Sequence, residues 1–421
     1  MSGRISTVRL GDPGVAEVIL GQSPPSSSYN DVGDGLPFFQ GKADFGLLHP
    51  IPRKWCNAGR KFAAAGDILM SVRAPVGDVN IATSDCVIGR GIAAIRAGSR
   101  TDPWFLYFAL FYSKPVLEGR ATGSTFASVN KATLNDLDIP FPERAEQVAI
   151  GLILRNLVEK IEQEGSIIST AHNLKRAAMR ELFTRGLRGE PQKETDIGPV
   201  PESWAAIPVA QLGVVKGGKR MPKGVSLVRE NTGRPYIRVT DFKDHSVRDE
   251  GILFVPVGYE DVIRRYRISS KDVYISIAGS IGLVGQVPEH LDDANLTENA
   301  AKIVFERDDV LPQYVMYALA SDACQEQIGR ATSKNAQPKL ALSRIEQILV
   351  PFPPMLEEQK EVVSVLDAIG RKIDLHRKKR AVLEELFKAL LHKLMTGEIR
   401  VDELDLSALE GVGTDSGGVA A

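Results

Sequence analysis

The sequence predicts a mixed α/β (α+β) fold made of two copies of one unit, in which a globular domain is followed by a long helix. The first observation is an internal repeat of about 210 residues, which is far longer than a solenoid unit and indicates a duplicated domain. The second is that each copy ends in a long proline-free segment with an apolar heptad pattern. We expect the two helices to pack as an antiparallel coiled coil with pseudo-twofold symmetry.

Five short motifs carry the repeat, and they occur in the same order in both halves. One matched tetrapeptide would be chance, whereas five in order with similar spacing indicate duplication. The offset between the copies drifts from 198 to 212 residues, which small insertions and deletions in loops explain. The matched segments are 37–40 with 235–238, 67–72 with 272–277, 103–110 with 312–319, 119–122 with 329–332, and 139–142 with 350–353.

The two long segments each open on a Glu-Gln pair, at 146–147 and at 358–359. Apolar residues then recur in alternating steps of four and three, which is the 3.5-residue period of a coiled coil. About 37 helical residues span roughly 55 Å. The apolar seam consists of Ile150, Leu154, Leu157, Ile161, Ile168 and Leu182 in the first copy, and of Val362, Leu366, Ile369, Ile373, Leu383, Phe387, Leu390 and Leu394 in the second.

Four polar residues interrupt this seam, namely Glu164 and Lys175 in the first helix and His376 and Arg380 in the second. One interpretation is that the helices splay or reach solvent at these positions. The other is that the polar groups pair and set the register of one helix against the other. The sequence leaves both open.

The repeat and the helix ends together predict the domain boundaries. Gly186 and Gly397 follow the last apolar turns and are expected helix stops. The predicted parts are a first globular domain (1–142), a first helix (143–187), a polar linker (188–196), a second globular domain (197–354), a second helix (355–397) and a flexible tail (398–421).

The globular domains contain short apolar runs rich in Val, Ile and aromatic residues, and turn residues bound these runs, which is typical of short buried strands. The expected strands include 67–72, 92–95, 236–239, 272–277 and 302–305. Two segments that begin at a proline, 103–113 and 312–324, are expected to be short amphipathic helices, because proline suits a first helical turn.

Composition excludes several classes of protein. The chain of 421 residues is 43% hydrophobic and 25% charged, and it has no apolar run long enough for a membrane helix and no signal-peptide core, so we expect a cytoplasmic protein without membrane contact. The net charge of −1 argues against a basic nucleic-acid coat but not against a local basic face. Cys56, Cys86 and Cys324 are scattered and expected to be reduced and buried, and no metal site is expected.

Basic, glycine-rich loops in both halves are the candidate DNA-binding surface. Glycine beside lysine or arginine lets backbone amides approach phosphates, arginine suits guanine, and Asn or Gln suits adenine. Taken singly, each residue is a solvated surface charge, whereas two matched sets favour a DNA face. The candidates are Gln40, Lys42, Arg53, Lys54, Arg60, Lys61, Arg73, Arg90, Arg120, Asn130 and Lys131 in the first half, and Lys216, Lys219, Arg220, Lys223, Arg238, Lys243, Arg330, Lys334, Asn335, Gln337 and Lys339 in the second.

Catalytic motifs are absent from the sequence. There is no GxxxxGK[ST] phosphate loop, no GxGxxG after a strand, no Asn/Asp-Pro-Pro-aromatic motif of adenine methyltransferases and no GxSxG. We therefore expect no catalytic residue and no bound cofactor in this chain.

This layout resembles the specificity subunits of Type I restriction-modification systems, from about residue 8 to about residue 400. Segments 20–25, 29–30 and 36–45 look like the start of one class of the family's target-recognition domains, and segments 197–204 and 235–242 look like its second domain. The Pro-Phe-Pro, Glu-Gln and long-helix succession is similar to its helical spacer. The family frequently has a tryptophan near the start of its first domain, and in this chain other residues stand there, around Val8 to Leu10.

The resemblance implies that each target-recognition domain reads one half of a bipartite, asymmetric site in double-stranded DNA, and that the helices set the gap between the half-sites. It also implies partners, namely modification subunits (two are expected) that carry S-adenosylmethionine, and restriction subunits that use ATP and Mg. The specificity subunit itself performs no chemistry.

Two other functions stay open at this point. The chain could be a self-contained DNA methyltransferase or nuclease with unrecognised motifs, or a coiled-coil scaffold that binds proteins and no DNA. Methyl transfer by the isolated chain would favour the first, and failure to select any bipartite DNA sequence would favour the second.

Overall fold

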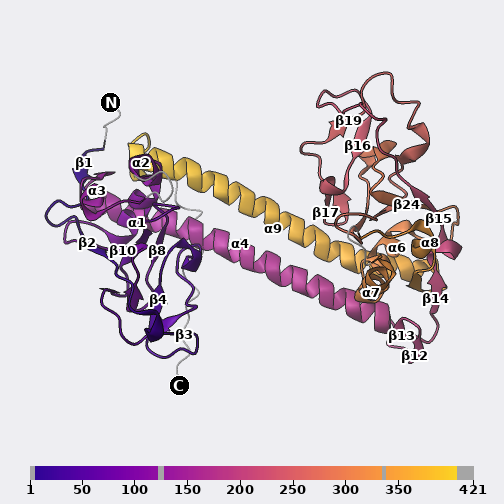
Figure 1. Cartoon of the computed structure of the whole chain (residues 1–421), viewed down its shortest axis with the longest axis horizontal. Helices are drawn as coiled ribbons and strands as arrows, with labels where there is room; N and C mark the ends of the chain where they lie inside the picture. The colour runs from indigo at the N-terminus through magenta and orange to yellow at the C-terminus, as the bar shows by residue number, and fades with distance from the viewer. Residues whose placement is uncertain (1–4, 122–127, 334–337, 405–421) are drawn as a thin grey trace. The chain divides into compact units, whose positions relative to one another are not determined.

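The computed structural model describes residues 5–121, 128–333 and 338–404, and it divides into two compact units (Figure 1). Unit 1 comprises Met1–Ile167 and His376–Ala421, and unit 2 comprises Ile168–Leu375. The long helices α4 (Arg144–Arg185) and α9 (Leu356–Thr396) each contribute one half to each unit. Each unit therefore contains one globular domain together with parts of both helices.

Unit 1 contains two larger sheets and three short helices. The four-stranded antiparallel sheet has the order β2-β10-β7-β8, and the five-stranded sheet has the order β3-β5-β4-β9-β6 with β4 parallel to β9. Strand β1 pairs with β11. The elements are β1 (Thr7–Arg9), β2 (Ala16–Leu20), β3 (Tyr29–Asn30), β4 (Leu36–Phe39), β5 (Trp55–Cys56), β6 (Phe62–Ala63), β7 (Ile68–Ser71), β8 (Val79–Ile81), β9 (Cys86–Ile88), β10 (Ile92–Ala97), α1 (Pro103–Tyr112), α2 (Lys114–Arg120), α3 (Lys131–Asn135) and β11 (Asp138–Pro140).

Unit 2 repeats this plan. Its four-stranded sheet has the order β15-β24-β21-β22, its second sheet has the order β19-β16-β23-β20 with β16 parallel to β23, and β14 pairs with β25. The elements are β12 (Gln192–Thr195), β13 (Gly198–Pro201), β14 (Ala205–Pro208), α5 (Val209–Leu212), β15 (Val214–Gly217), β16 (Pro235–Ile237), β17 (Phe242–Lys243), β18 (Ser246–Val247), β19 (Leu253–Phe254), η4 (Arg264–Tyr266), β20 (Arg267–Ile268), β21 (Val273–Ser276), β22 (Val284–Gln286), β23 (Ala294–Leu296), β24 (Ala300–Val304), α6 (Pro312–Leu319), α7 (Asp322–Ala331), α8 (Leu342–Glu346) and β25 (Leu349–Phe352).

The strands of the two units correspond, except that β3 of unit 1 has no counterpart in the second sheet of unit 2, and this correspondence confirms the duplicated mixed α/β fold. The predicted strands fall on β7, β10, β16, β21 and β24. In both units the sheet that contains the parallel pair lies away from the long helices (Figure 1), and we call it the distal sheet. Unit 2 adds two hairpins, β12–β13 and β17–β18.

The helices after the sheet differ from the sequence prediction. Segment 103–113 forms α1 and then α2 begins at once, and segment 312–324 is divided between α6 and α7. They are also not amphipathic, since residues 105–110 of α1 and 314–319 of α6 are all buried. The reason is that each of these helices lies in the core of its unit, where sheet strands and the long helices supply apolar neighbours together. The prolines do occupy the first helical turns, as predicted.

The segment expected to be a linker between helix and second domain is partly ordered as a strand. Gln192–Thr195 forms β12 and pairs antiparallel with β13. Its polar side chains had suggested a linker, but a two-stranded hairpin at the surface needs backbone pairing and few apolar side chains. The expected helix stops are confirmed, because Gly186 and Gly397 follow the ends of α4 and α9 with left-handed φ of 64° and 73°.

Most of the predicted seam is buried within each unit, whereas Ile168, Ile369, Leu383 and Leu390 are half-buried. In unit 1, residues near the start of α4, from Ile150 to Ile161, share a core with residues near the end of α9, from Phe387 to Met395. In unit 2, Leu182 near the end of α4 shares a core with Val362 and Leu366 near the start of α9. The two helices therefore run antiparallel in each unit, as expected.

The polar interruptions of the seam divide between the two interpretations. Glu164 is buried and accepts hydrogen bonds from Nδ1 of His376 at 2.5 Å and Nζ of Lys379 at 2.6 Å. Lys175 lies over the ring of Tyr317, with 4.8 Å between Nζ and the ring centroid. Arg380 instead faces solvent and pairs with Glu384 of its own helix. The pairing interpretation therefore holds for Glu164, Lys175 and His376, and the solvent interpretation holds for Arg380.

The glutamine of each Glu-Gln pair attaches its long helix to its domain, and one of its two contacts is the same in both units. Oε1 of Gln147 accepts from the backbone N–H of Asp102, and its Nε2 donates to the carbonyl of Pro142. Oε1 of Gln359 accepts from the backbone N–H of Leu311, and its Nε2 donates to the carbonyl of Asp309. Both glutamines are buried, at 1% and 0% exposure. The contact to Oε1 is matched and holds the residue before α1 or α6 against the long helix, whereas the acceptors of Nε2 differ between the units.

Candidate nucleic-acid interface

Strand directions gather the candidate cations of unit 1 at one edge of its distal sheet. Strands β4 and β9 are parallel, so their carboxyl ends, followed by Gln40 and Arg90, reach the same edge. Strands β5 and β6 run antiparallel to them, so their amino ends, preceded by Lys54 and Lys61, reach that edge too. We call this set, with Arg53 and Arg60, the basic edge of unit 1.

Backbone hydrogen bonds define this edge closely. The N–H of Phe38 donates to the carbonyl of Lys54 at 2.8 Å, and the N–H of Ile88 donates to the carbonyl of Lys61 at 3.0 Å. The N–H of Val72 donates to the carbonyl of Gly91 at 2.9 Å, which brings Arg73 beside Arg90. The edge therefore continues onto the turn that follows β7.

These side chains are available to a ligand. Gln40 and the cations Arg53, Lys54, Arg60, Lys61, Arg73 and Arg90 are all exposed. None of the six cations forms an ion pair with any residue among those that the structure describes. Unpaired cations at one edge attract phosphate without first breaking a salt bridge.

The next part of this surface comes from the chain returning beside the β7–β8 turn. Arg73 forms an isolated β-bridge with Ser128, and α3 begins at Lys131 just beyond it. Lys131 is exposed, whereas the side-chain oxygen of Asn130 accepts from the N–H of Thr133 and caps α3. The predicted adenine contact from Asn130 is thus a helix cap in this structure, with its carbonyl oxygen already used.

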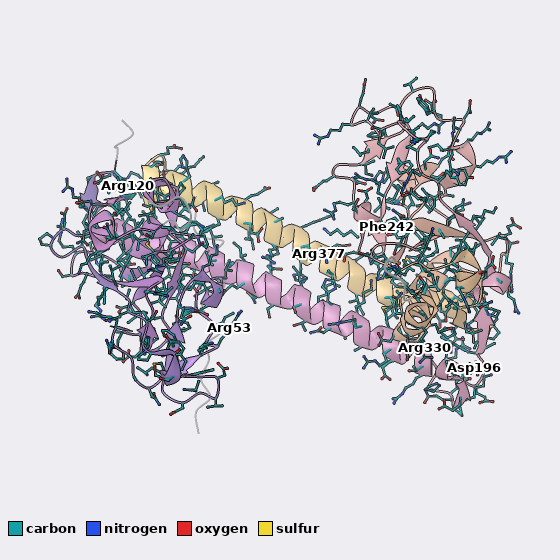
Figure 2. The ribbon with its side chains drawn as sticks, viewed as in Figure 1. Arg53, Arg120, Asp196, Phe242, Arg330 and Arg377 are labelled. Atoms are coloured by element: carbon teal, nitrogen blue, oxygen red, sulfur yellow. The ribbon has the colours of Figure 1, made fainter. Side chains whose placement is uncertain are left out.

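Two of the predicted cations of unit 1 have other partners. Nζ of Lys42 pairs with Asp78 at 2.9 Å. Arg120, at the end of α2, donates to the carbonyl of Asp136, and it lies well apart from Arg53 in Figure 2. These two positions are therefore not part of the basic edge.

The corresponding edge of unit 2 has a different set of side chains. Arg238 follows β16, Glu298 lies two residues after β23, and Lys219 is held there because its N–H donates to the carbonyl of Leu296. Arg238 binds Asp241 through Nε and Nη2, and Arg220 binds Glu298. We call Lys219, Arg220, Arg238 and Glu298 the mixed-charge edge of unit 2.

The remaining candidates of unit 2 lie at separate places. Three lysines are exposed, namely Lys216 on β15, Lys223 in the loop after β15, and Lys243 on β17. Arg330 pairs with Glu326 of the same helix, α7. Lys339 is exposed beside the β21–β22 turn, through its bridge to Ala278. Figure 2 shows Arg330 apart from Phe242 of the β17–β18 hairpin. The candidates Lys334, Asn335 and Gln337 lie outside the described residues.

Arg264 and Arg265 were missed by the sequence analysis. They lie in η4, and Tyr266 separates them from β20. Sheet register places Arg265 at the position of Arg60 and Tyr266 at the position of Lys61, so the arginine pair is displaced by one residue from the pair before β6. Both are exposed and form no ion pair with a described residue. The signal in the sequence was a pair of adjacent arginines shortly before a strand, but the strand itself has only two residues.

Sheet register gives residue-by-residue equivalence between the two edges. Phe39 is paired with Ile88 in unit 1, and Ile237 is paired with Leu296 in unit 2. Gln40 therefore corresponds to Arg238, as the sequence repeat predicted, and Arg90 corresponds to Glu298. At this second position the charge is reversed between the units.

A shared glycine makes each edge possible. A Cβ on Gly21 would lie 2.2 Å from the carbonyl oxygen of Gly89, and one on Gly218 would lie 2.0 Å from that of Thr297. No side chain fits at either position, because the backbone after β2 and after β15 lies directly against the backbone at the carboxyl ends of β9 and β23. Because Gly218 lies so close to the backbone after β23, the residues that follow it, including Lys219 and Arg220, lie at the sheet edge.

Other chemistry is limited in the described part of the chain. No cluster of three or more His, Cys, Asp or Glu residues suited to a metal ion occurs among these residues. The three cysteines are free and buried as predicted, and burial raises the pKa of Cys86 and of Cys324 to about 12, so both thiols are protonated at neutral pH. Of the described helices, none has the length and apolar character to cross a membrane.

The structure thus has two matched α/β domains, each joined to a long helix and each with exposed basic side chains at one edge of its distal sheet, an arrangement that is typical of nucleic-acid-binding proteins. The family model of the Type I restriction modification DNA specificity domain matches residues 6–171 and 201–385, once in each copy of the repeat. These matches cover most of the chain, and the chain belongs to this family of Type I specificity subunits.

Individual relatives agree with the family. A putative type I restriction enzyme MjaX specificity subunit of Methanocaldococcus jannaschii is 41% identical over 182 residues, which is 43% of this chain and 43% of that protein, so less than half of that relative is matched. The MjaVIII specificity subunit of the same organism is 25% identical over 312 residues, 72% of each chain. The crystal structure of a Type I restriction-modification S subunit from M. genitalium has the same fold, with a TM-score of 0.62, 17% identity and coverage of 93% of this chain and 96% of that one.

Proposed function

We propose that each domain of this specificity subunit reads one half of a bipartite, asymmetric sequence in double-stranded DNA. The observation that carries the proposal is the pair of equivalent sheet edges with unlike side chains, Gln40 and Arg90 in unit 1 against Arg238 and Glu298 in unit 2. Base identity is read by hydrogen-bond donors and acceptors, so edges that differ in these groups favour different bases. A site with two unlike halves is the consequence.

Phosphate contacts supply much of the affinity in this proposal. The unpaired cations of the basic edge, together with Arg264 and Arg265, are suited to neutralising backbone phosphates. A net charge of −1 for the whole chain is compatible with this, because a phosphate responds to charges within about 10 Å at ordinary ionic strength.

The two long helices, in this proposal, set the gap between the half-sites. Helix α4 has 42 residues and α9 has 41, so each is about 60 Å long. Adding the same number of heptads to both helices keeps the antiparallel seam in register and changes only its length. The gap in the recognised sequence should then increase.

The subunit itself performs no chemistry under this proposal and acts in the cytoplasm as part of a larger complex. Modification subunits (two are expected) would supply S-adenosylmethionine and adenine methylation, and restriction subunits would supply ATP- and Mg-dependent translocation and cleavage. The family relationship supports a recognition role over a self-contained methyltransferase or nuclease.

Selection from random-sequence DNA tests the proposal. The full chain is assembled with its modification subunits, and methylated sequences are recovered from a random pool. We expect one bipartite motif with unlike halves. Enrichment of no bipartite sequence would favour a protein-binding scaffold, and methyl transfer from labelled S-adenosylmethionine by the chain alone would favour a self-contained enzyme.

Matched insertions test the role of the helices. A variant with one added heptad in each of α4 and α9 is compared with the natural chain in the same selection. The expected result is an unchanged pair of half-sites with a longer gap. An unchanged gap would refute the spacer role while leaving sequence recognition intact.

A further inference from the structure

Arg220 at the mixed-charge edge of unit 2 binds one carboxylate through Nε, and the rest of its guanidinium group remains exposed. Its Nε lies 2.5 Å from Oε1 of Glu298, and its side chain remains 77% exposed. The other oxygen of Glu298 accepts from the hydroxyl of Thr297 at 3.1 Å. The carboxylate is thus fixed from one side, and the arginine projects from it into solvent.

The charge state of this pair is settled by its contacts. Burial of Glu298 disfavours its ionised form, but hydrogen bonds from Arg220, from its own backbone and from Thr297 hold the pKa of the carboxyl below its usual value. Glu298 is therefore ionised at neutral pH. An ionised acceptor on Nε orients the whole guanidinium plane, because the plane is rigid.

The terminal amino groups of Arg220 form no hydrogen bond with any described residue. Arg238 differs at this point, because its Nε binds Asp241 and its Nη2 binds both Asp241 and the carbonyl of Gly251. Guanine offers two acceptors, N7 and O6, that match a pair of arginine donors in the major groove. Arg220 presents such donors already oriented, and Arg238 is committed to the protein.

The same two positions also contact one another in unit 1. Sheet register pairs Ile95 with Val18 in unit 1 and Ile303 with Val215 in unit 2, so Arg220 corresponds to Ser23 and Glu298 corresponds to Arg90. In unit 1 the hydroxyl of Ser23 accepts from the backbone N–H of Arg90 at 3.2 Å, which leaves the Arg90 side chain free. Each unit thus has one available arginine at this contact. In unit 1 it is Arg90, at the position of Glu298, and in unit 2 it is Arg220, at the position of Ser23.

We propose that Arg220 determines specificity for a guanine in the half-site read by unit 2, and that Glu298 is its positioning residue. The proposal rests on the proposed DNA recognition and deepens it by naming the base and the two residues that read it. Arg220 donates from its terminal amino groups to N7 and O6 of the guanine. Glu298 contacts no base and acts through the Nε of Arg220.

Motif selection with the full complex tests the proposal at the resolution of single base pairs. In R220A and R220K the preference for guanine at one position of one half-site is expected to fall roughly 10- to 100-fold, because lysine keeps the charge but has no paired donors. E298A should relax the same position, and E298Q, which keeps an acceptor for Nε, should restore most of the preference. The other half-site and the gap should not change.

Arg307 supplies the matched control. It is also held by a carboxylate, through Nε and Nη2 to Asp309, but it lies beyond Val304, at the end of β24 opposite to the edge. R307A should leave the whole motif unchanged. The proposal is overturned if R220A leaves the motif unchanged, or if it weakens all positions of the half-site equally, as removal of a phosphate-binding cation or unfolding would. If the natural complex selects no bipartite motif, the proposed function itself fails.

Discussion

The carboxylate of Glu164 lies 2.5 Å from Nδ1 of His376, and these two residues occupy the same position in the two copies of the repeat, 212 residues apart. In a pair of antiparallel helices, equivalent positions can meet only at the middle of the pairing. Contact between Glu164 and His376 therefore marks that middle, within unit 1. Lys379, one turn farther along α9, pairs with the same carboxylate. Glu164 is thus a buried charge in the seam that is paired, in this register, with two side chains of the facing helix.

Removing this acceptor should weaken the packing of α9 on α4. In E164A the donors on His376 and Lys379 lose their partner, and we expect the free energy of unfolding to fall by about 1.5–3 kcal/mol, the range for hydrogen bonds to charged groups. Urea unfolding followed by circular dichroism measures this. Glu162→Ala, which removes an exposed glutamate of the same helix, is the control and should change stability by less than about 0.5 kcal/mol. Equal effects of the two substitutions would contradict the role of the cluster.

The same carboxylate gives the seam a defined acid response. Burial opposes ionisation of Glu164, but hydrogen bonds from Lys379 and His376 lower its pKa below the usual 4.5. Because the folded-state pKa is the lower one, the stabilisation is present above pH 4.5 and is lost as pH falls through the folded-state value. The difference in stability between the natural chain and E164Q should therefore narrow below pH 4.5. A difference that is constant across that range would show that the carboxylate does not titrate in this way.

The matched glutamines predict equal destabilisation in both units. Gln147→Ala and Gln359→Ala each remove two hydrogen bonds from a buried amide and leave the N–H of Asp102 or of Leu311 without its acceptor. We expect each to cost about 2–4 kcal/mol, since a buried donor without a partner adds to the removal of the hydrogen bonds themselves. Hydrogen exchange of these two amides reports the change locally. Gln163→Ala on the exposed face of α4 should have no measurable effect, and faster exchange there as well would indicate general loosening of the helix.

Arg53 and Lys54 of the basic edge should contribute to affinity without contributing to sequence choice. In the double variant Arg53→Ala, Lys54→Ala, binding to specific and random DNA should fall by similar factors. The slope of log affinity against log salt should decrease by about 0.9 for each phosphate that the variant no longer neutralises. Titrations of the assembled complex at several salt concentrations measure both. Arg100→Ala changes a cation that lies beyond the opposite end of β10, and it should leave the slope unchanged. A change in the selected motif in the double variant would instead make these residues base readers.

An unmatched insertion should act differently from the matched insertions in both helices. One heptad added to α4 alone, after Glu164, keeps the apolar face but displaces every later residue of the seam by one repeat. In unit 2, Leu182 would no longer meet Val362, and that core would have to shift or open. We expect lower stability of unit 2, seen as a separate, earlier transition in thermal unfolding. A single transition at the natural temperature would mean that the seam tolerates register shifts.

The sequence alone was sufficient for the duplication, the seam and the helix ends, because all of these are periodic or local. A heptad pattern needs only the spacing of apolar residues such as Leu154 and Leu366, and a helix stop needs only the backbone freedom of Gly186 or Gly397. The correspondence of Gln40 with Arg238 could likewise be predicted, since flanking strand residues repeat with them.

Tertiary structure decided which polar residues are already engaged and which remain available. Arg238 and Arg53 are both arginines in loops, but only the folded chain brings Asp241 to the first and leaves the second unpaired. The correspondence of Arg90 with Glu298 depends on strand pairing, because loops of unequal length separate them from the repeated motifs. Ion pairs join residues that are distant in sequence, such as Arg220 and Glu298, 78 positions apart, and no local pattern encodes that distance.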